Sequence, residues 1–277
     1  MIKTILLGID GSQHALNAEE YALWLGQRMD ATVVGLHVVD IVSIEGSFFH
    51  DISGSLGFEP YFDLSSKMRE ALTDRGQTLL TAYQDRAAAK HARIDSVLAI
   101  GVVANELADR AKTADLVVIG NRGSNEKYST GLLGSTAESI ARKSPKPVLV
   151  VPAQFRTPTK ALLAYDGSQR AAAAMQTAAE CCSALQLPLT VLIVCREREA
   201  GEKLAAEACK YLASHRLESE CVVETGHAPE QIVSFLGRGF DLLFIGAYGH
   251  SRIIEMVLGS TTEYVLRNAP CPVFLNR

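Results

Sequence analysis

The sequence predicts an α/β protein made of two tandem doubly wound domains, each with a parallel sheet flanked by helices. Short apolar runs alternate with segments of helical periodicity along most of the chain, which is typical of strands joined by crossover helices. The pattern also begins twice, because residues 161–169 (ALLAYDGSQ) repeat residues 6–13 (LLGIDGSQ) at an offset of 156 residues (166 − 10). A length of 277 residues suits two domains of about 100–200 residues each.

The first copy opens with a strand–helix–strand unit. Residues 4–9 form an apolar run that a turn signal closes, which predicts a buried strand. Residues 15–29 carry apolar side chains at helical spacing and predict a helix, and residues 31–39 predict the second strand. We expect the connection between these parallel strands to be right-handed.

The pattern is interrupted at residues 40–66, where glycines, a proline and several aromatic side chains replace the periodic apolar positions. We interpret this stretch as an insertion, because long loops in compact domains often serve as lids or binding surfaces. A plain excursion over the surface of the sheet is an equally good interpretation.

Regular alternation resumes after the insertion. The elements expected there are helices at 67–90, 104–112 and 135–143 and strands at 94–100, 116–119 and 145–151. A linker at 153–159 then separates domain 1, residues 1–152, from domain 2, residues 160–277. The offset between the copies falls from 156 to 125 residues (259 − 134), so the second copy lacks most of the insertion.

Composition and charge argue against several classes of protein. The net charge of −4 gives no broad basic surface for nucleic acid or anionic lipid. No apolar run approaches the ~18 residues that a bilayer-spanning helix needs. We therefore expect no nucleic-acid or membrane partner, a cytoplasmic location, and free thiols at cysteines that form neither a disulfide framework nor a zinc site. These cysteines are Cys181, Cys182, Cys195, Cys209, Cys221 and Cys271.

In each copy, a glycine-containing loop joins an apolar strand to the start of a helix. Each helix start has the Ser-x-x-Glu spacing of a capping box, at Ser260–Glu263 and Ser135–Glu138. Glycine lets a ligand approach the backbone, and a helix N-terminus attracts phosphate. The same residues also serve ordinary turns and caps, but two copies with this spacing favour a phosphate site. The glycines are Gly246, Gly249 and Gly259 in the second copy and Gly120, Gly123 and Gly134 in the first.

A carboxylate follows the first strand of each copy, Asp10 in the first and Asp166 in the second. Ligands of open parallel sheets bind outside the carboxyl ends of the strands, so we expect each carboxylate near its glycine loop. There it could accept a hydrogen bond from an adenine amine or a ribose hydroxyl, or help to hold a divalent ion. The alternative is an Asx turn that starts the next helix, and the two roles are compatible.

No motif of a common enzyme class accompanies these loops. The sequence has neither the Walker A pattern nor G-x-G-x-x-G, and it has no G-x-S-x-G elbow. Its seven histidines show no metal-ligand spacing. We therefore expect no catalytic residue set and no metal centre made by protein side chains alone. The basic loop residues that could neutralise phosphate, or simply face solvent, are Arg122, Lys127, His250 and Arg252.

The spacing Gly-x2-Gly-x9-Gly-Ser, with the early Asp and a closing Pro-x-Pro-Val strand, resembles the nucleotide-binding universal stress proteins over essentially the whole chain. The resemblance implies a five-stranded parallel sheet in each domain, of the adenine-nucleotide alpha-hydrolase-like kind. It also implies ATP as the ligand, alone or with Mg²⁺ or Mn²⁺. Carried over by position, the site residues of the second copy are Asp166, Val194, Gly246, Gly249, Gly259, Ser260 and Thr261. Those of the first copy are Asp10, Val38, Gly120, Gly123, Gly134, Ser135 and Thr136.

The first copy has ten residues rather than nine between its last two glycines, so we expect the second site to bind more strongly. The resemblance further implies that the last strands of the two copies, Val148–Val151 and Val273–Leu275, pair side by side. The two domains would then form a pseudo-dimer within one chain, and two chains would associate as a homodimer.

These observations leave three hypotheses for function. The leading one is a cytoplasmic ATP-binding protein of the stress response, whose nucleotide state regulates a partner or its own assembly. The second is an enzyme that slowly hydrolyses ATP or phosphorylates itself. The third is a scaffold or small-ligand module that uses the aromatic residues of the 40–66 insertion.

Overall fold

The computed structural model describes residues 2–40, 58–123, 134–247 and 259–277, with the side chains of α4 described from residue 65 onward. The elements of the first half are β1 (Thr4–Gly8), α1 (Gln13–Met29), β2 (Thr32–Asp40), α4 (Phe58–Ala89), β3 (Ile94–Gly101), α5 (Val103–Ala111), β4 (Leu116–Gly120), α6 (Ser135–Lys143) and β5 (Val148–Val151). Those of the second half are β6 (Ala161–Ala164), α7 (Gln169–Leu185), β7 (Leu189–Cys195), α8 (Arg198–Ala213), β8 (Ser219–Thr225), α9 (Ala228–Leu236), β9 (Leu242–Gly246), α10 (Ser260–Asn268) and β10 (Val273–Asn276).

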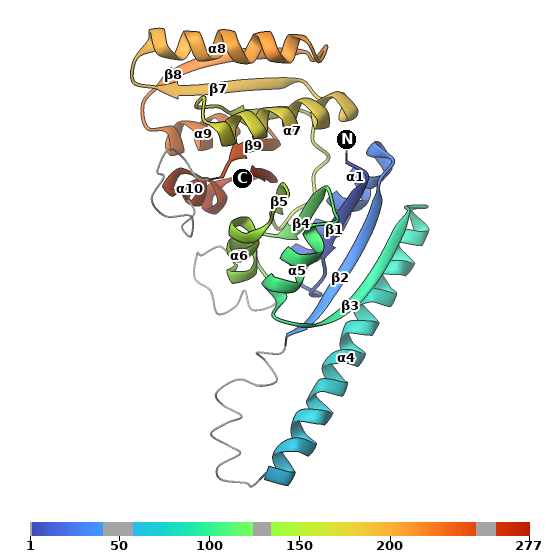
Figure 1. The fold of residues 1–277 in the computed structure, drawn as a ribbon. Coiled ribbons are helices and arrows are strands. Elements are labelled where there is room, and N and C mark those ends of the chain that lie inside the picture. The colour runs from blue at the N-terminus through green and yellow to red at the C-terminus, as the bar shows by residue number, and fades with distance from the viewer. Residues whose placement is uncertain (1, 41–57, 124–133, 248–258) are drawn as a thin grey trace.

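The strands form one ten-stranded sheet in the order β3-β2-β1-β4-β5-β10-β9-β6-β7-β8. Pairing is parallel within each half, so the predicted α/β class with five parallel strands per half is confirmed. The two halves join where β10 pairs with β5 antiparallel, with Phe274 opposite Leu149. The predicted pairing of the last strands is therefore confirmed, and it makes the two sheets continuous (Figure 1).

Helices cover both faces of this sheet, and each face has its own apolar core. Tyr21 of α1, Tyr83 of α4 and side chains of α7 and α8 belong to one core. The other core contains Ile140 of α6 and Phe235 of α9, together with side chains of α5 and α10. The strands contribute to both cores because successive side chains of a strand point to opposite faces. This arrangement leaves the carboxyl ends of the strands as the edge where a ligand can approach.

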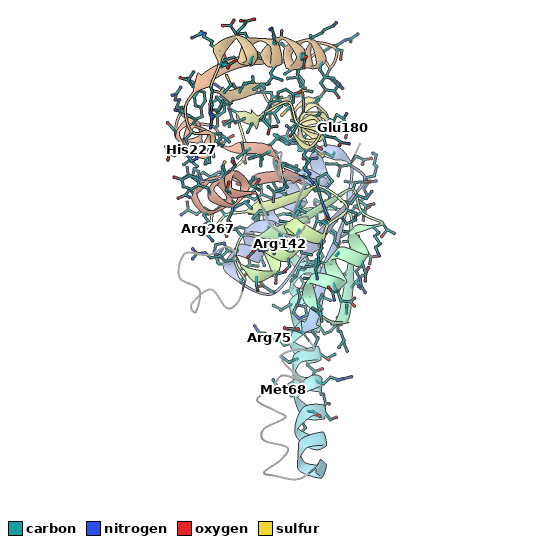
Figure 2. The ribbon with its side chains drawn as sticks, turned by 60° about the vertical axis from the view of Figure 1, so that its left-hand side comes forward. Met68, Arg75, Arg142, Glu180, His227 and Arg267 are labelled. Carbon is teal, nitrogen blue, oxygen red and sulfur yellow. A yellow bond between two sulfur atoms is a disulfide. The ribbon has the colours of Figure 1, made fainter. Side chains whose placement is uncertain are left out.

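Helix α4 begins at Phe58, earlier than the start at residue 67 that the sequence predicts. Pro60 lies in the first turn of the helix, where its missing amide hydrogen breaks no intrahelical bond. Between Pro60 and Gly76 the sequence has no glycine or proline that would end or interrupt the helix. The helix extends well beyond the sheet, and Met68 marks its projecting part (Figures 1 and 2). Residues 41–57 of the expected insertion lie outside the described residues.

The segment between the halves is held by side chains on both sides of it. The Asn17 amide of α1 donates to the Ala153 carbonyl at 2.5 Å. The Tyr21 hydroxyl donates to the Arg156 carbonyl at 2.8 Å and accepts from the Arg156 amide at 2.9 Å. These bonds fix the path of the chain from β5 to β6 along α1.

The expectation of free thiols is wrong for two of the six cysteines. Cys209 of α8 and Cys221 of β8 form a disulfide, with their Cα atoms 6.5 Å apart. The sequence does not predict this disulfide, because the two cysteines meet only when α8 packs on the edge strand β8. Cys181, Cys182, Cys195 and Cys271 are free thiols. Among the helices in the described ranges, none combines the length and the apolar character needed to cross a bilayer.

Candidate functional site

Each half places a carboxylate at the end of its first strand, in the same local turn. Asp166 accepts the Ser168 amide at 3.0 Å through Oδ1, and Asp10 makes the same bond with the Ser12 amide at 2.9 Å. The serine of each turn then caps the next helix, because its hydroxyl accepts an amide of the first helical turn. The Asx turn is therefore confirmed in both halves, and it fixes the direction of both carboxylates.

A glycine follows each carboxylate in a conformation that other residues rarely adopt. Gly167 has φ +75°, and Gly11 has φ +79°. A Cβ at Gly167 would lie 2.7 Å from Cδ2 of Leu204, a residue of α8. Leu79 of α4 occupies the same place beside Gly11, at 2.9 Å. The crossover helix of each half thus packs directly on the turn that carries the carboxylate.

The first glycine of each loop motif has a packing role. A Cβ at Gly246 would lie 2.8 Å from the Ala171 amide nitrogen and 2.8 Å from the Arg170 carbonyl carbon. At Gly120 a Cβ would lie 2.7 Å from Cβ of His14. Both glycines therefore allow the end of a strand to touch the first turn of a helix, and this contact brings the glycine loop next to the carboxylate turn.

The helix starts differ from the predicted capping boxes. Gly259 and Gly134 are the N-cap residues, and neither cap has a side-chain hydrogen bond, so Ser260 and Ser135 are the first helical residues. Glu263 instead pairs with Arg267 one turn on, at 2.5 Å. Glu138 likewise pairs with Arg142. The prediction fails because Ser-x-x-Glu also occurs one position inside a helix, where each glutamate can reach an arginine four residues on.

A cavity of about 100 Å³ lies at the carboxyl ends of β6, β7 and β9, next to the N-termini of α9 and α10. It brings together predicted site residues from four separate segments, Asp166, Val194, Gly246 and Thr261. The other lining residues are Ala164, Tyr165, Ser168, Ala171, Leu192, Ala228, Ile232, Ile245 and Thr262. Because pockets for drug-sized ligands usually enclose ~300–1,000 Å³, this cavity accommodates part of a ligand.

The cavity has an apolar part and a polar part. Leu192, Val194 and Ile232 supply apolar side chains, which suit the face of a flat ring. Asp166 and Thr261 supply oxygen atoms, and the helix start at α10 supplies amides that have no acceptor within the helix. A ligand with an aromatic ring, hydroxyl groups and an anionic end would match this division.

Several residues that line the cavity could not be predicted from the sequence. Tyr165, Ala228 and Ile232 were not predicted, because which face of an element borders a cavity depends on how helices and strands pack. The sequence did hold one signal, since Gly226-His-Ala-Pro resembles a segment of the first copy at Gly101. Burial raises the pKa of the Tyr165 hydroxyl above its ordinary value.

In the first half, several of the predicted residues lie around the ends of β1 and β4. A Cβ at Gly123 would lie 2.9 Å from Oδ2 of Asp10, so the glycine backbone passes next to the carboxylate. The Gly134 amide donates to the Asn121 carbonyl at 2.9 Å. This bond brings the start of α6, with Ser135 and Thr136, back to the end of β4. Val38 is buried in β2.

Some predicted residues cannot be placed. Gly249 of the second loop lies outside the described residues, as do Lys127, His250 and Arg252. Gly259 and Ser260 are placed at the start of α10, beside the cavity-lining Thr261.

Comparisons with known proteins give a consistent result. The sequence model described as "Universal stress protein family" matches residues 1–152 and 196–277. A universal stress protein of Synechocystis sp. is 34% identical over 289 residues, covering 100% of both chains. A universal stress protein of Methanocaldococcus jannaschii is 33% identical over 157 residues, covering 54% of this chain and 82% of that protein. The crystal structure of a universal stress protein from Archaeoglobus fulgidus shares the fold, with a TM-score of 0.78, 20% identity and 99% and 98% of the two chains covered.

Proposed function

The chain belongs to the universal stress protein family, and we propose that it is an ATP-binding regulatory protein whose main nucleotide site is the cavity beside Asp166. The observation that carries this proposal is the cavity itself. It joins a carboxylate, an apolar wall and a helix start, which come from segments spread along the chain between Asp166 and Thr261. These are the three kinds of group that a nucleotide requires.

The parts of ATP can be assigned to the parts of the cavity. The adenine ring would lie against Leu192, Val194 and Ile232, where burial of an apolar face is favourable. The ribose hydroxyls or the adenine amine would donate to the Asp166 carboxylate. The phosphates would approach Thr261 and the first amides of α10, whose N-terminus favours negative charge.

The polyphosphate also requires a source of positive charge. None of the described residues that line the cavity is Lys, Arg or His. A divalent ion such as Mg²⁺ or Mn²⁺ bound to the phosphates would supply this charge. The loop residues His250 and Arg252, which lie outside the described residues, are the other candidate source. We propose that the ligand is ATP, alone or bound to Mg²⁺ or Mn²⁺.

The proposal extends to the whole chain. Residues 1–152 and 160–277 would act as two domains around the linker at 153–159, with the second domain as the stronger nucleotide site. The protein would work in the cytoplasm as part of a stress response, two chains would form a homodimer, and the nucleotide would bias the binding of a regulated partner. The β5–β10 pairing supports this, since it couples the two domains through one sheet.

Isothermal titration with ATP, with and without MgCl₂, tests the proposal. The test variant is Gly259→Val. Its N-cap φ of −58° and ψ of 143° are open to any residue, so the helix is expected to persist while the branched side chain obstructs the amides of α10. We expect ATP to bind the natural protein and to bind the variant at least about tenfold more weakly, which corresponds to the loss of one charged hydrogen bond.

Thermal unfolding and circular dichroism of Gly259→Val serve as the control for folding. Native mass spectrometry of the purified protein would report retained nucleotide and its stoichiometry. Absence of ATP binding by the natural protein, or unchanged affinity in a folded Gly259→Val variant, would contradict the proposal.

A further inference from the structure

In the second half, a disulfide links helix α8 to the edge strand β8. The same helix supports the turn that carries Asp166. Cys209 lies on α8 and Cys221 on β8, and both residues are only partly buried. β8 is the last strand of the sheet, so within the described ranges no further strand pairs with its outer edge. Figure 1 shows α8 as the outermost helix over β7 and β8. A reductant in solution can therefore reach this disulfide.

The same helix packs against the turn after Asp166, and one of its charged side chains acts on the residue before it. Leu204 packs against Gly167, as the 2.7 Å distance to a Cβ at that glycine shows. Glu207 lies close enough to Tyr165 for its charge to raise the pKa of that hydroxyl, in addition to the larger effect of burial. The position of α8 thus bears on the residues immediately before and after the carboxylate that borders the cavity.

The first half provides an internal comparison at the same positions. With the offset of 125 residues, Cys209 corresponds to Gln84 (209 − 125) and Cys221 to Ser96 (221 − 125). The sheet registers agree, since Cys221 pairs with Val191 and Ser96 with Gly35, which are 156 residues apart (191 − 35). In the first half the tie is a hydrogen bond, from Nε2 of Gln84 to Oγ of Ser96 at 2.7 Å. In both halves, therefore, the crossover helix is linked to the edge strand at the same position. Only the link of the second half, the disulfide, responds to reduction.

We propose that Cys209–Cys221 is a redox-modification site that controls nucleotide binding at the cavity beside Asp166. A dithiol reductant transfers two electrons and two protons to the disulfide, so Cys209 and Cys221 become thiols and the reductant becomes a disulfide. Loss of the covalent tie leaves α8 held to β8 by packing alone, so the contact of Leu204 with Gly167 supports the turn less firmly. Reduction then weakens binding of the nucleotide. Disulfides of cytoplasmic proteins are usually redox-sensing or catalytic, which agrees with this role.

This inference rests on the proposed nucleotide site, and one experiment separates the two. The full chain is titrated with ATP after oxidation with oxidised glutathione and again after reduction with dithiothreitol. We expect reduction to weaken binding at least about fivefold, the lower end of usual coupling between sites. The matched variant carries Cys209→Gln together with Cys221→Ser, which installs the hydrogen-bonded pair of the first half. It is expected to bind ATP and to show no response to dithiothreitol.

Alkylation of the native protein with iodoacetamide, read by peptide mass spectrometry, reports the state of the pair. Burial raises the pKa of the Cys182 and Cys271 thiols to about 12, so these residues are expected to remain unmodified in both states. Alkylation of Cys209 and Cys221 in the oxidised protein, or equal ATP affinity in both states, overturns the switch while leaving the nucleotide site intact. Absence of ATP binding in either state overturns the switch and the proposed function together.

Discussion

At the scale of single residues, the Asp166 side chain has two roles. It holds a turn, and it faces the cavity where we expect the ligand. Its Oδ1 accepts the Ser168 amide at 3.0 Å and holds the turn that starts α7. The residue also lines the cavity, where a change of charge would reach a bound ligand. An asparagine keeps the oxygen that the turn needs and removes the charge. Asp166→Asn can therefore separate the role in the turn from the role in ligand binding.

We predict that Asp166→Asn weakens ATP binding about tenfold or more, because a hydrogen bond to a charged group contributes about 1.5–3 kcal/mol. The matched control is Asp10→Asn, which makes the same change in the same turn of the first half. We expect this control to alter ATP affinity much less, since the second site is expected to be the stronger one. Isothermal titration measures both variants. A larger loss for Asp10→Asn would reverse the assignment of the main site.

At the scale of elements, α4 is fastened to α1 by a charged pair that the second half lacks. The Arg86 guanidinium donates two hydrogen bonds of 2.7 Å to the Glu19 carboxylate, whose side chain is only 3% exposed. The corresponding positions of the second half, by the offsets of 156 and 125, hold Met175, which belongs to the apolar core, and Tyr211, which packs against it. The same helix joint is therefore charged in one half and apolar in the other.

We predict that Arg86→Met lowers the free energy of unfolding by about 2–3 kcal/mol, because it leaves the Glu19 carboxylate buried without its partner. This figure lies below the usual cost for a fully buried pair, since the Arg86 side chain is 40% exposed. The double variant Glu19→Met with Arg86→Tyr installs the apolar pair of the second half and is expected to recover most of the loss. Urea denaturation measures both. A double variant no more stable than Arg86→Met would contradict this interpretation.

At the scale of the whole molecule, the two halves are joined by more than the sheet. The β5–β10 pairing makes the sheet continuous, and Tyr21 and Asn17 of α1 hold the segment that leads into the second half. Asp241, just before β9, accepts the Thr159 amide at 2.8 Å, so the second half holds the far end of that segment. The segment is thus bonded to both halves.

Much of this architecture could be predicted from the sequence because it depends on local pattern and on repetition. Each strand is a short apolar run, and the doubled Asp-Gly-Ser-Gln and glycine loops revealed two copies. Features that depend on which surfaces meet could not be predicted in this way. The Cys209–Cys221 disulfide requires α8 to pack on β8, and the cavity wall at Ile232 depends on how α9 lies on the sheet. The start of α4 at Phe58 was missed because apolar periodicity is weak in a helix that projects from the body.

The last prediction concerns alkaline pH and the hydroxyl of Tyr21, which holds the segment between the two halves. Burial raises the pKa of Tyr21 to about 12, while its ordinary value is 10.0. Burial raises the pKa of Tyr83 as well. Each hydroxyl is therefore neutral in the folded protein at a pH where it ionises in the unfolded chain. Its contribution to stability is fully present below pH 10 and is lost as the pH rises through the folded pKa.

We predict that the free energy of unfolding falls between pH 10 and pH 12, with Tyr21 contributing up to about 1.4 kcal/mol per pH unit. Tyr21→Phe removes this contribution, together with the bonds to Arg156. The variant is expected to be less stable than the natural protein at pH 8 by about 1–3 kcal/mol, and the difference should shrink between pH 10 and pH 12. Urea denaturation at a series of pH values measures both curves. A constant difference over this range would show that Tyr21 is not held neutral at the joint, because the pH-dependent part of the difference comes from its ionisation.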